Sequence, residues 1–249
     1  ARAHRSRTDA VPRKRLYRER ASAKGTAERF SVSGGESTMI YLFRHGAVDT
    51  DGRRFIGQSN RPLNAEGRRQ AGAWRDRLEG MAWRAVYAGD LDRTRETAEI
   101  IAGKPPTLLP ELREIHLGDW EGVPMAEIRR TQPERWRERG ERMDQFRPPG
   151  GESFADLQKR VWPVFQTLAE GPGPALVVAH AGVNRAILCR LLAMPLAALF
   201  RLGQDPGCLN RIDPTRNPFR VVSVNEPAVP GEAEAGLGVR GEKKGGRRP

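Results

Sequence analysis

Apolar runs alternate with segments of helical periodicity through the middle of the chain. Apolar strands are predicted at 39–44, 84–89 and 175–180. The last of these, with the sequence ALVVAH, is nearly all apolar, which is typical of a strand buried on both faces. Two further strands, around 207–212 and 219–224, are predicted to form a hairpin or the edge of a sheet.

The segments between these strands carry helical signals. One helix is predicted to begin at Asn64 as its N-cap, and a second to begin at Asp90 and end at Gly103. Further helices are predicted near 124–131, near 133–143, from about Ser153 to Glu170, and over GVNRAILCRLLAM. This alternation predicts an α/β fold, a three-layer α/β/α sandwich with a mainly parallel central sheet.

The two ends of the chain differ from its middle. Residues 1–38 have few apolar positions and no sustained period, so we expect a disordered basic leader. Residues 226–249 are rich in Gly, Pro and charge, which is typical of a flexible tail. The sequence therefore predicts one domain, 39–225. Because Met39 directly precedes the first strand, we also expect that the leader is not native coding sequence.

The charge is concentrated outside this domain. Of the net charge of +12, the leader carries ten Lys and Arg against four acids, and the domain has an excess of only +5. No aromatic interleaving or helix-turn-helix pattern accompanies the basic leader, so we expect no nucleic-acid partner. No apolar run approaches the roughly eighteen residues of a membrane span, so we expect no membrane partner.

The cysteine content bears on the compartment. Cys189 and Cys208 form no close pair and no metal-type cluster, and a disulfide between them is not expected. Together with the absence of an apolar signal-peptide core in the first forty residues, this predicts a cytoplasmic protein. Oligomeric state is left open by the sequence, with a homodimer among the options.

Polar residues and glycines follow three of the predicted strands. The strand ends are Arg44-His45-Gly46, Asp90 with Arg93 soon after it, and His180-Ala181-Gly182. Ligands of open α/β sheets bind outside the carboxyl ends of the strands, so these groups are predicted to meet at one edge.

Each of these residues also has a structural explanation. Either histidine could simply be hydrogen-bonded at the end of a strand, and the glycines could serve turns. Arg93 could form a surface ion pair with a nearby acid: Asp92, Glu96 or Glu99. Their convergence on one edge favours a phosphate site instead. Guanidiniums bind phosphate oxygens in pairs, and a neutral imidazole can attack phosphorus. Since arginines supply the positive charge, no metal and no cofactor are expected.

A set of motifs in fixed order sharpens this hypothesis. FRHG, LDRTRETA, LREIHLGDWEG, PPGGES and AHAGVNRAIL, between Met39 and Val224, resemble those of the histidine phosphatase superfamily, also called phosphoglycerate mutase-like. The resemblance implies that His45 becomes phosphohistidine and that Arg44, Arg93 and His180 hold the phosphoryl oxygens. It also implies that Glu114 protonates the leaving alkoxide and then activates water. From spacing alone, Glu114 would be a surface carboxylate paired with Arg113.

The resemblance extends to substrate binding. The residues it implies there are Gly46, Gln58, Asn64, Ala181 and Gly182. One departure is Ala47-Val48, where the family often has Glu-Thr after Arg-His-Gly, so Ala47 removes a donor that often contacts phosphate.

The spacing of the motifs also bears on the branch of the family. Glu114 and His180 are only 66 residues apart, which resembles the phosphatases more than the mutases. GRRFIGQSNRPLN and AHAGVNRAILCRLL look most like α-ribazole phosphatases. The prediction is a metal-independent phosphomonoesterase of a small-molecule ester, with α-ribazole 5'-phosphate as one candidate. A 2,3-bisphosphoglycerate-dependent phosphoglycerate mutase and a catalytically silent phosphate-binding protein are the alternatives.

Overall fold

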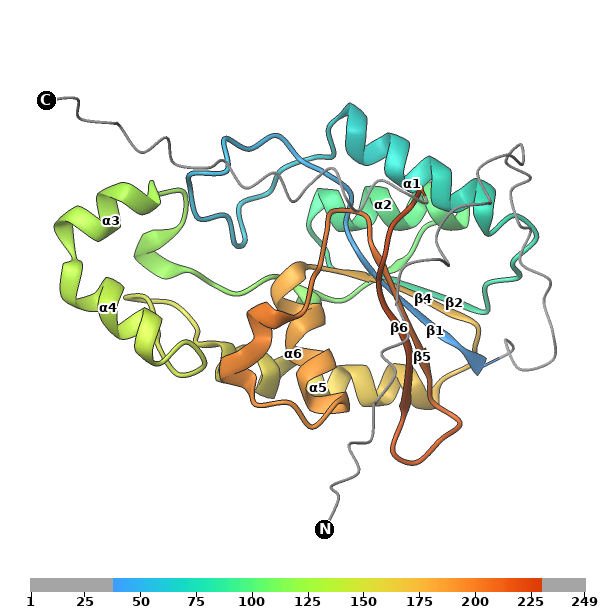
Figure 1. Ribbon diagram of the computed structural model, residues 1–249. Helices are drawn as coiled ribbons and strands as arrows, with labels where there is room; N and C mark the ends of the chain where they lie inside the picture. The colour runs from blue at the N-terminus through green and yellow to red at the C-terminus, as the bar shows by residue number, and fades with distance from the viewer. Residues whose placement is uncertain (1–37, 230–249) are drawn as a thin grey trace, which may run out of the picture.

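The computed structural model describes residues 38–229 (Figure 1). The predictions for the leader and the tail therefore lie almost wholly outside the described residues. The last strand continues to Glu226 and Ala228 is buried, so the packed part of the chain extends a few residues past 225.

The elements alternate as the apolar pattern predicts. In chain order they are β1 (Ile40–Arg44), α1 (Ala65–Arg77), β2 (Ala85–Ala88), α2 (Asp92–Ala102), β3 (Thr107–Leu108), η2 (Pro110–Leu112), η3 (Gly118–Trp120), α3 (Met125–Thr131), α4 (Pro133–Glu141), α5 (Phe154–Glu170), β4 (Ala175–Ala179), α6 (Ala181–Leu191), η4 (Leu196–Arg201), β5 (Leu209–Asp213) and β6 (Arg220–Glu226).

One six-stranded sheet lies at the centre, in the order β3-β2-β4-β1-β5-β6. The first four strands in this order run parallel, and β5 and β6 are antiparallel to their neighbours. The mainly parallel sheet and the hairpin of the last two strands are both confirmed. Since β4 lies between β1 and β2, their three carboxyl ends are adjacent at one edge.

Helices cover both faces of the sheet (Figure 1). Successive strand residues point to opposite faces. In β1, Tyr41 and Phe43 join an apolar cluster with Trp74 of α1. On the other face, Leu42 joins a cluster with Leu157 of α5. The three-layer α/β/α sandwich is therefore confirmed.

The helix ends follow the predicted signals with one exception. Asn64 caps α1, because its Oδ1 accepts a hydrogen bond from Gly67 N at 2.8 Å. Gly103 ends α2 with a φ of 67°, in the left-handed region that suits glycine. The predicted cap at Asp90 is wrong. Its carboxylate instead accepts from Arg113 Nε at 2.7 Å, so a charge-assisted pair holds it away from the helix end.

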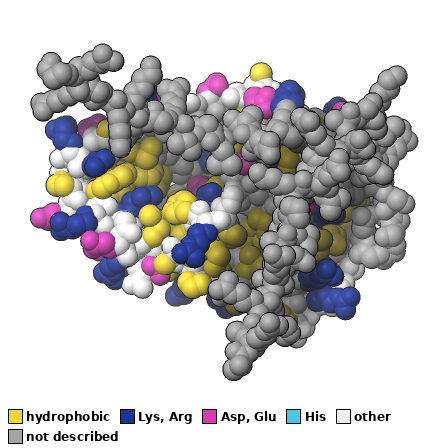
Figure 2. All heavy atoms as spheres, viewed as in Figure 1, with side chains coloured by type: hydrophobic (Ala, Val, Ile, Leu, Met, Phe, Trp, Pro, Cys, Tyr) yellow, Lys and Arg dark blue, Asp and Glu magenta, His cyan; other side chains and the backbone are white. Residues whose placement is uncertain are grey.

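The connection between η3 and α5 is the main part of the chain outside the sandwich. Its helices α3 and α4 lie beside the layers rather than on the sheet (Figure 1). On the face shown in Figure 2, Lys and Arg side chains are interspersed with acidic and hydrophobic ones where the surface is not grey. Between residues 38 and 229, no helix has the length and apolar character needed to cross a bilayer.

Candidate active site

The adjacent strand ends bring the predicted residues together. Arg44 and His45 stand at the end of β1, His180 follows β4, and Arg93 lies in the first turn of α2, the helix that follows β2. The rings of His45 and His180 meet edge to face, with their centroids 5.2 Å apart. Parallel order alone therefore places two imidazoles and two guanidiniums at one edge of the sheet.

The hydrogen bond of His45 defines which ring nitrogen is free. His45 is buried, and its Nδ1 lies 2.7 Å from the carbonyl oxygen of Gly46. Because a carbonyl oxygen only accepts, Nδ1 carries the proton and Nε2 keeps its lone pair. Burial, followed by the charges of Arg44 and Arg93, holds the pKa of His45 well below its usual 6.5. The ring is therefore neutral and nucleophilic at neutral pH.

His180 has the opposite tautomer. Arg93 Nε donates to its Nδ1 at 3.3 Å, so the ring proton is on Nε2. Burial and the neighbouring Arg93 hold the pKa of His180 well below 6.5. Its Nε2 is buried and has no hydrogen-bond partner among the described residues. An unused buried donor is costly, so this N–H is suited to a ligand oxygen.

Arg93 is held by main-chain carbonyls rather than by surface acids. Nη1 donates to Ser59 O at 2.8 Å and Nη2 to Gly57 O at 2.6 Å. The same loop is tied down by Glu121, whose carboxylate accepts from the backbone N–H of both residues. The surface ion pair that the sequence left open for Arg93 is not formed among the described residues; Asp92 pairs with Arg95 and Glu96 with Arg68.

Arg44 is hydrogen-bonded to a residue of a buried network of side-chain amides. Its Nη1 donates to Gln204 O at 2.5 Å, while its Nε is buried without a partner among the described residues. The side-chain oxygen of Gln204 accepts from Asn184 at 3.0 Å and from Asn210 at 3.1 Å. All three amides are buried, so the network fixes the backbone to which Arg44 is bound.

The chain after His45 passes very close to the start of α1. A Cβ at Gly46 would lie 2.5 Å from Gly67 O, so only glycine permits this approach. The backbone N–H of Gly46 donates to Thr97 Oγ1 at 3.1 Å, and that of Ala47 donates to Gln70 Oε1 at 2.9 Å. Both N–H groups thus already have protein partners, and the predicted contact of Gly46 with substrate stays a prediction.

Glu114 lies beside the phosphate site and not on the surface with Arg113, which pairs with Asp90. One oxygen of Glu114 accepts from Gly182 N, at the start of α6, at 3.0 Å. A Cβ at Gly182 would come within 2.3 Å of the other oxygen, so this glycine lets the carboxylate approach. Ala181 and Gly182 thereby share a wall with Glu114.

The two remaining predicted residues have clear structural contacts. Gln58 donates from Nε2 to Glu114 O at 2.9 Å and so positions the backbone of that residue. Asn64 caps α1, and its Nδ2 donates to Asp49 at 3.3 Å. A direct contact of either side chain with substrate stays a prediction.

The arrangement of these residues agrees with a sequence match to a known protein family. Residues 40–227 match the model of the histidine phosphatase superfamily (branch 1). The chain belongs to the histidine phosphatase superfamily. It is an enzyme of the phosphatase type.

Curated relatives of this histidine phosphatase carry two kinds of name. The adenosylcobalamin/alpha-ribazole phosphatase of Escherichia coli is 30% identical over 181 residues, which cover 70% of this chain and 89% of that protein. The probable phosphoglycerate mutase GpmB of Serratia proteamaculans is 34% identical over 189 residues, covering 73% and 87%.

Solved structures of similar proteins share the fold. The alpha-ribazole phosphatase of Shigella flexneri aligns with a TM-score of 0.70 at 26% identity, covering 76% of this chain and 96% of that one. A mycobacterial glucosyl-3-phosphoglycerate phosphatase aligns with a TM-score of 0.67 at 29% identity, covering 76% and 99%.

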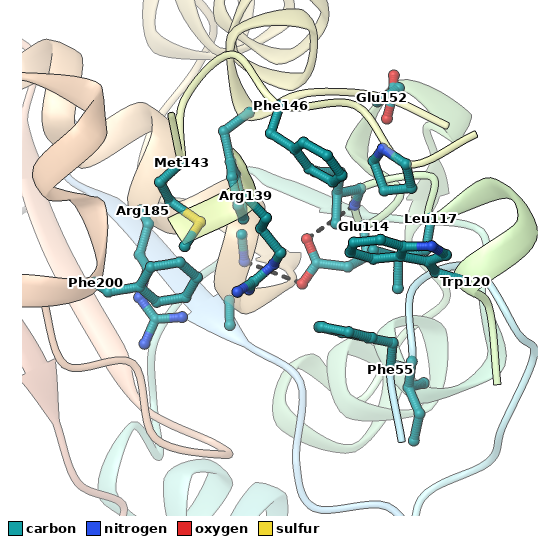
Figure 3. A pocket seen from close by; sticks show the side chains of 16 residues that line it. Phe55, Glu114, Leu117, Trp120, Arg139, Met143, Phe146, Glu152, Arg185 and Phe200 are labelled. Carbon is teal, nitrogen blue, oxygen red and sulfur yellow. Dashed lines mark hydrogen bonds between the residues drawn. The ribbon is translucent and has the colours of Figure 1, made fainter. Parts of the chain in front are cut away.

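A pocket of about 210 Å³ opens next to the phosphate site of this histidine phosphatase. Figure 3 shows Glu114 in its wall, between Trp120 on one side and Arg139 on the other. Five aromatic residues are part of the lining: Phe55, Trp120, Phe146, Phe154 and Phe200. Because Glu114 faces both regions, this pocket is where the alcohol part of a bound ester would lie.

Several functional residues of this site were missed by the sequence patterns. Glu121 lies within the motif LREIHLGDWEG, so the motif was a signal that it could have a role. Thr97 likewise lies within the motif LDRTRETA, whereas Gln70 and Gln204 gave no local signal. Each contacts a residue of the β1 end from a distant part of the chain.

Proposed function

We propose that this enzyme hydrolyses small phosphate monoesters through a phosphohistidine at His45, without a metal ion. The observation that carries the proposal is a neutral His45 beside Arg44, Arg93 and the N–H of His180. Neither His45 Nε2 nor this N–H has a hydrogen-bond partner among the described residues. These groups supply the nucleophile, two cations and a donor for a phosphoryl group.

The reaction has two balanced steps. In the first, the lone pair of His45 Nε2 forms a bond to phosphorus, the ester P–O bond breaks, and Glu114 gives its proton to the leaving oxygen. In the second, Glu114 takes a proton from water, the water oxygen forms a bond to phosphorus, and the P–N bond breaks. Inorganic phosphate leaves and His45 is regenerated.

The candidate substrate that we carry forward is α-ribazole 5'-phosphate. The names of the relatives from Escherichia coli and Shigella flexneri support it, and the aromatic pocket beside Glu114 suits a ring system. The relative named as a probable phosphoglycerate mutase keeps mutase activity as the competing proposal. We place the enzyme in the cytoplasm, since Cys189 and Cys208 are both free and buried.

Trapping the intermediate tests the proposal. The protein is mixed with a ³²P-labelled ester in EDTA and quenched at alkaline pH, which preserves phosphohistidine. We expect label on the protein and phosphate release without added bisphosphoglycerate. His45→Ala is expected to lose the label and to lower turnover by at least about 10⁴-fold.

The matched control is His116→Ala, which changes an exposed histidine. It is expected to keep both the label and turnover. Rapid wild-type turnover with no label on the protein would refute the phosphohistidine. Activity that appears only with 2,3-bisphosphoglycerate would favour the mutase.

A further inference from the structure

Two arginines line the pocket beside Glu114. Arg139 comes from α4 and Arg185 from α6, so they reach the pocket from two different elements. Figure 3 shows both guanidiniums on the side of the pocket where Phe200 and Met143 lie.

Each of these guanidiniums is held against aromatic rings. Arg139 lies 5.2 Å from the ring centroid of Phe55 and 5.5 Å from that of Trp136. Arg185 lies 5.2 Å from the centroid of Phe200, and its Nε donates to Leu202 O at 2.9 Å. Such contacts fix the position of a cation while leaving its outer N–H groups available.

In the part of the chain that the structure describes, neither cation has an acidic partner, in contrast to four arginines near the pocket. Among the described residues, no carboxylate lies within 4.0 Å of Arg139 or Arg185. These four pairs are Arg147 with Asp156, Arg160 with Glu152, Arg142 with Glu138 and Arg137 with Glu141. Half-buried charges are stabilised by pairing, so the missing partners point to a ligand.

Among the described residues, the acids of the pocket form no ion pair with these two arginines. Burial lowers the pKa of Arg185, and the charge of Glu114 opposes this shift. Glu152 lines the pocket, but its carboxylate is paired with Arg160 at 2.8 Å. Glu114 accepts from backbone N–H groups, and in the proposed first step it carries the proton for the leaving group. When an ester binds, the pocket therefore presents two unmatched positive charges beside apolar rings.

We propose that this pocket selects phosphate monoesters whose alcohol is planar and apolar and carries an additional anionic group, with Arg139 and Arg185 as the specificity residues. This rests on the proposed function, because the ester must place its phosphate at His45. The aromatic side chains contact the ring of the alcohol, and the guanidiniums bind its anionic substituent. α-Ribazole 5'-phosphate carries a planar apolar ring, but on a polar ribose and without a second anionic group, so this proposal competes with it as the substrate.

A pair of nearly isosteric esters tests the proposal. The probes are the phosphate esters of 4-hydroxyphenylacetate and of 4-hydroxyphenylacetamide, in which a methylene insulates the phenol oxygen from the substituent. We expect kcat/KM to favour the carboxylate over the amide by roughly tenfold or more, as for a hydrogen-bonded charge pair. Arg139→Gln and Arg185→Gln should each bring this ratio toward one, with folding checked by thermal melting.

Matched controls lie on the same helices. Arg137→Gln removes a cation of α4 that pairs with Glu141, and Arg190→Gln removes one of α6 that lies over Trp162. Both are expected to keep the wild-type ratio. A wild-type ratio of one or less, or a ratio that neither pocket variant changes, would overturn the proposal. Since both probes would still be hydrolysed, that outcome differs from failure of the proposed function, in which neither ester is turned over.

Discussion

The phosphate site and the adjacent pocket are built in opposite ways. The phosphate site is buried and polar, and its main groups stand at the ends of parallel strands or in the turn that follows. The pocket is mostly apolar. It is lined largely by residues from the loops after β1, between η2 and η3 and between α4 and α5, together with three residues of α6. The strand ends thus hold the groups to which we assign the chemistry, while loops make up much of the region proposed to bind the alcohol part of the substrate.

Hydrogen bonding shows the same contrast. Arg93 uses its three donor positions on His180, Ser59 and Gly57, so it is held in one orientation. Within residues 38–229, Arg139 is held by contacts with two aromatic rings and by no hydrogen bond or ion pair. A substitution in the phosphate site is therefore expected to affect every substrate, and one in the pocket only particular substrates.

Arg93→Lys offers the strongest test of this contrast. Lysine keeps the charge, but it cannot bond two carbonyls and orient His180 at once. We expect kcat/KM to fall by about 10²-fold or more, by the same factor for phenyl phosphate and for alkyl phosphates. Steady-state kinetics on both classes measures this.

The matched control is Arg95→Lys, two residues along the same helix, where the side chain pairs with Asp92 on the surface. It is expected to behave as wild type. Loss confined to one class of ester in Arg93→Lys would contradict the division into a common site and a selective pocket.

The same division explains which parts could be predicted from the sequence. His45 and His180 follow short apolar runs, and an α/β pattern brings such strand ends together whatever the loops do. Arg44 and Arg93 are placed by the same rule. No such rule places Glu114, because its position depends on the loop that begins after η2. Only the motif predicted a role for it in the site, where it accepts a hydrogen bond from Gly182 N.

Long-range contacts account for what was missed. Aspartate is a common N-cap residue, yet the carboxylate of Asp90 accepts a hydrogen bond from Arg113, which is 23 residues away. Gln204 supports Arg44 across 160 residues, and nothing in its local sequence marks it. The pocket combines Phe55, Arg139 and Phe200 from three separate segments, so its composition became visible only when the chain was folded.

Glu114→Gln tests the boundary between the two regions. The amide keeps the shape of the carboxylate but cannot deliver a proton to the leaving oxygen. Alkyl phosphates need that proton, and we expect their hydrolysis to slow by about 10²-fold or more. Esters of acidic phenols such as 4-nitrophenol leave without it and should lose far less.

A plot of the logarithm of kcat/KM against the pKa of the leaving alcohol, for a series of esters, measures this effect. The slope of this plot is expected to be steeper for Glu114→Gln than for the wild type. Glu111→Gln, which changes an exposed acid in η2, should keep the wild-type slope. An equal loss on all esters in Glu114→Gln would assign the residue to the common phosphate site instead.

The smallest effect concerns the stability of the protein in acid, where the two buried histidines of the phosphate site matter. His45 and His180 have pKa values held well below 6.5 by burial and by the nearby arginines, so the folded protein keeps them neutral below pH 6.5. The unfolded chain protonates them near pH 6.5, and the free energy of unfolding therefore falls as the pH drops below that value. The slope is about 1.4 kcal/mol per pH unit for each histidine.

Comparison with His45→Gln isolates one histidine from the carboxylates that also titrate in acid. Denaturant unfolding is measured at intervals between pH 6.5 and pH 5 for both proteins. The variant is expected to lose about 1.4 kcal/mol less stability per pH unit than the wild type, whatever its stability at pH 7. Parallel curves would mean that His45 takes up a proton in the folded state as readily as in the unfolded chain. A protonated imidazole has no lone pair on Nε2, so that result would also weaken the assignment of His45 as the nucleophile in mild acid.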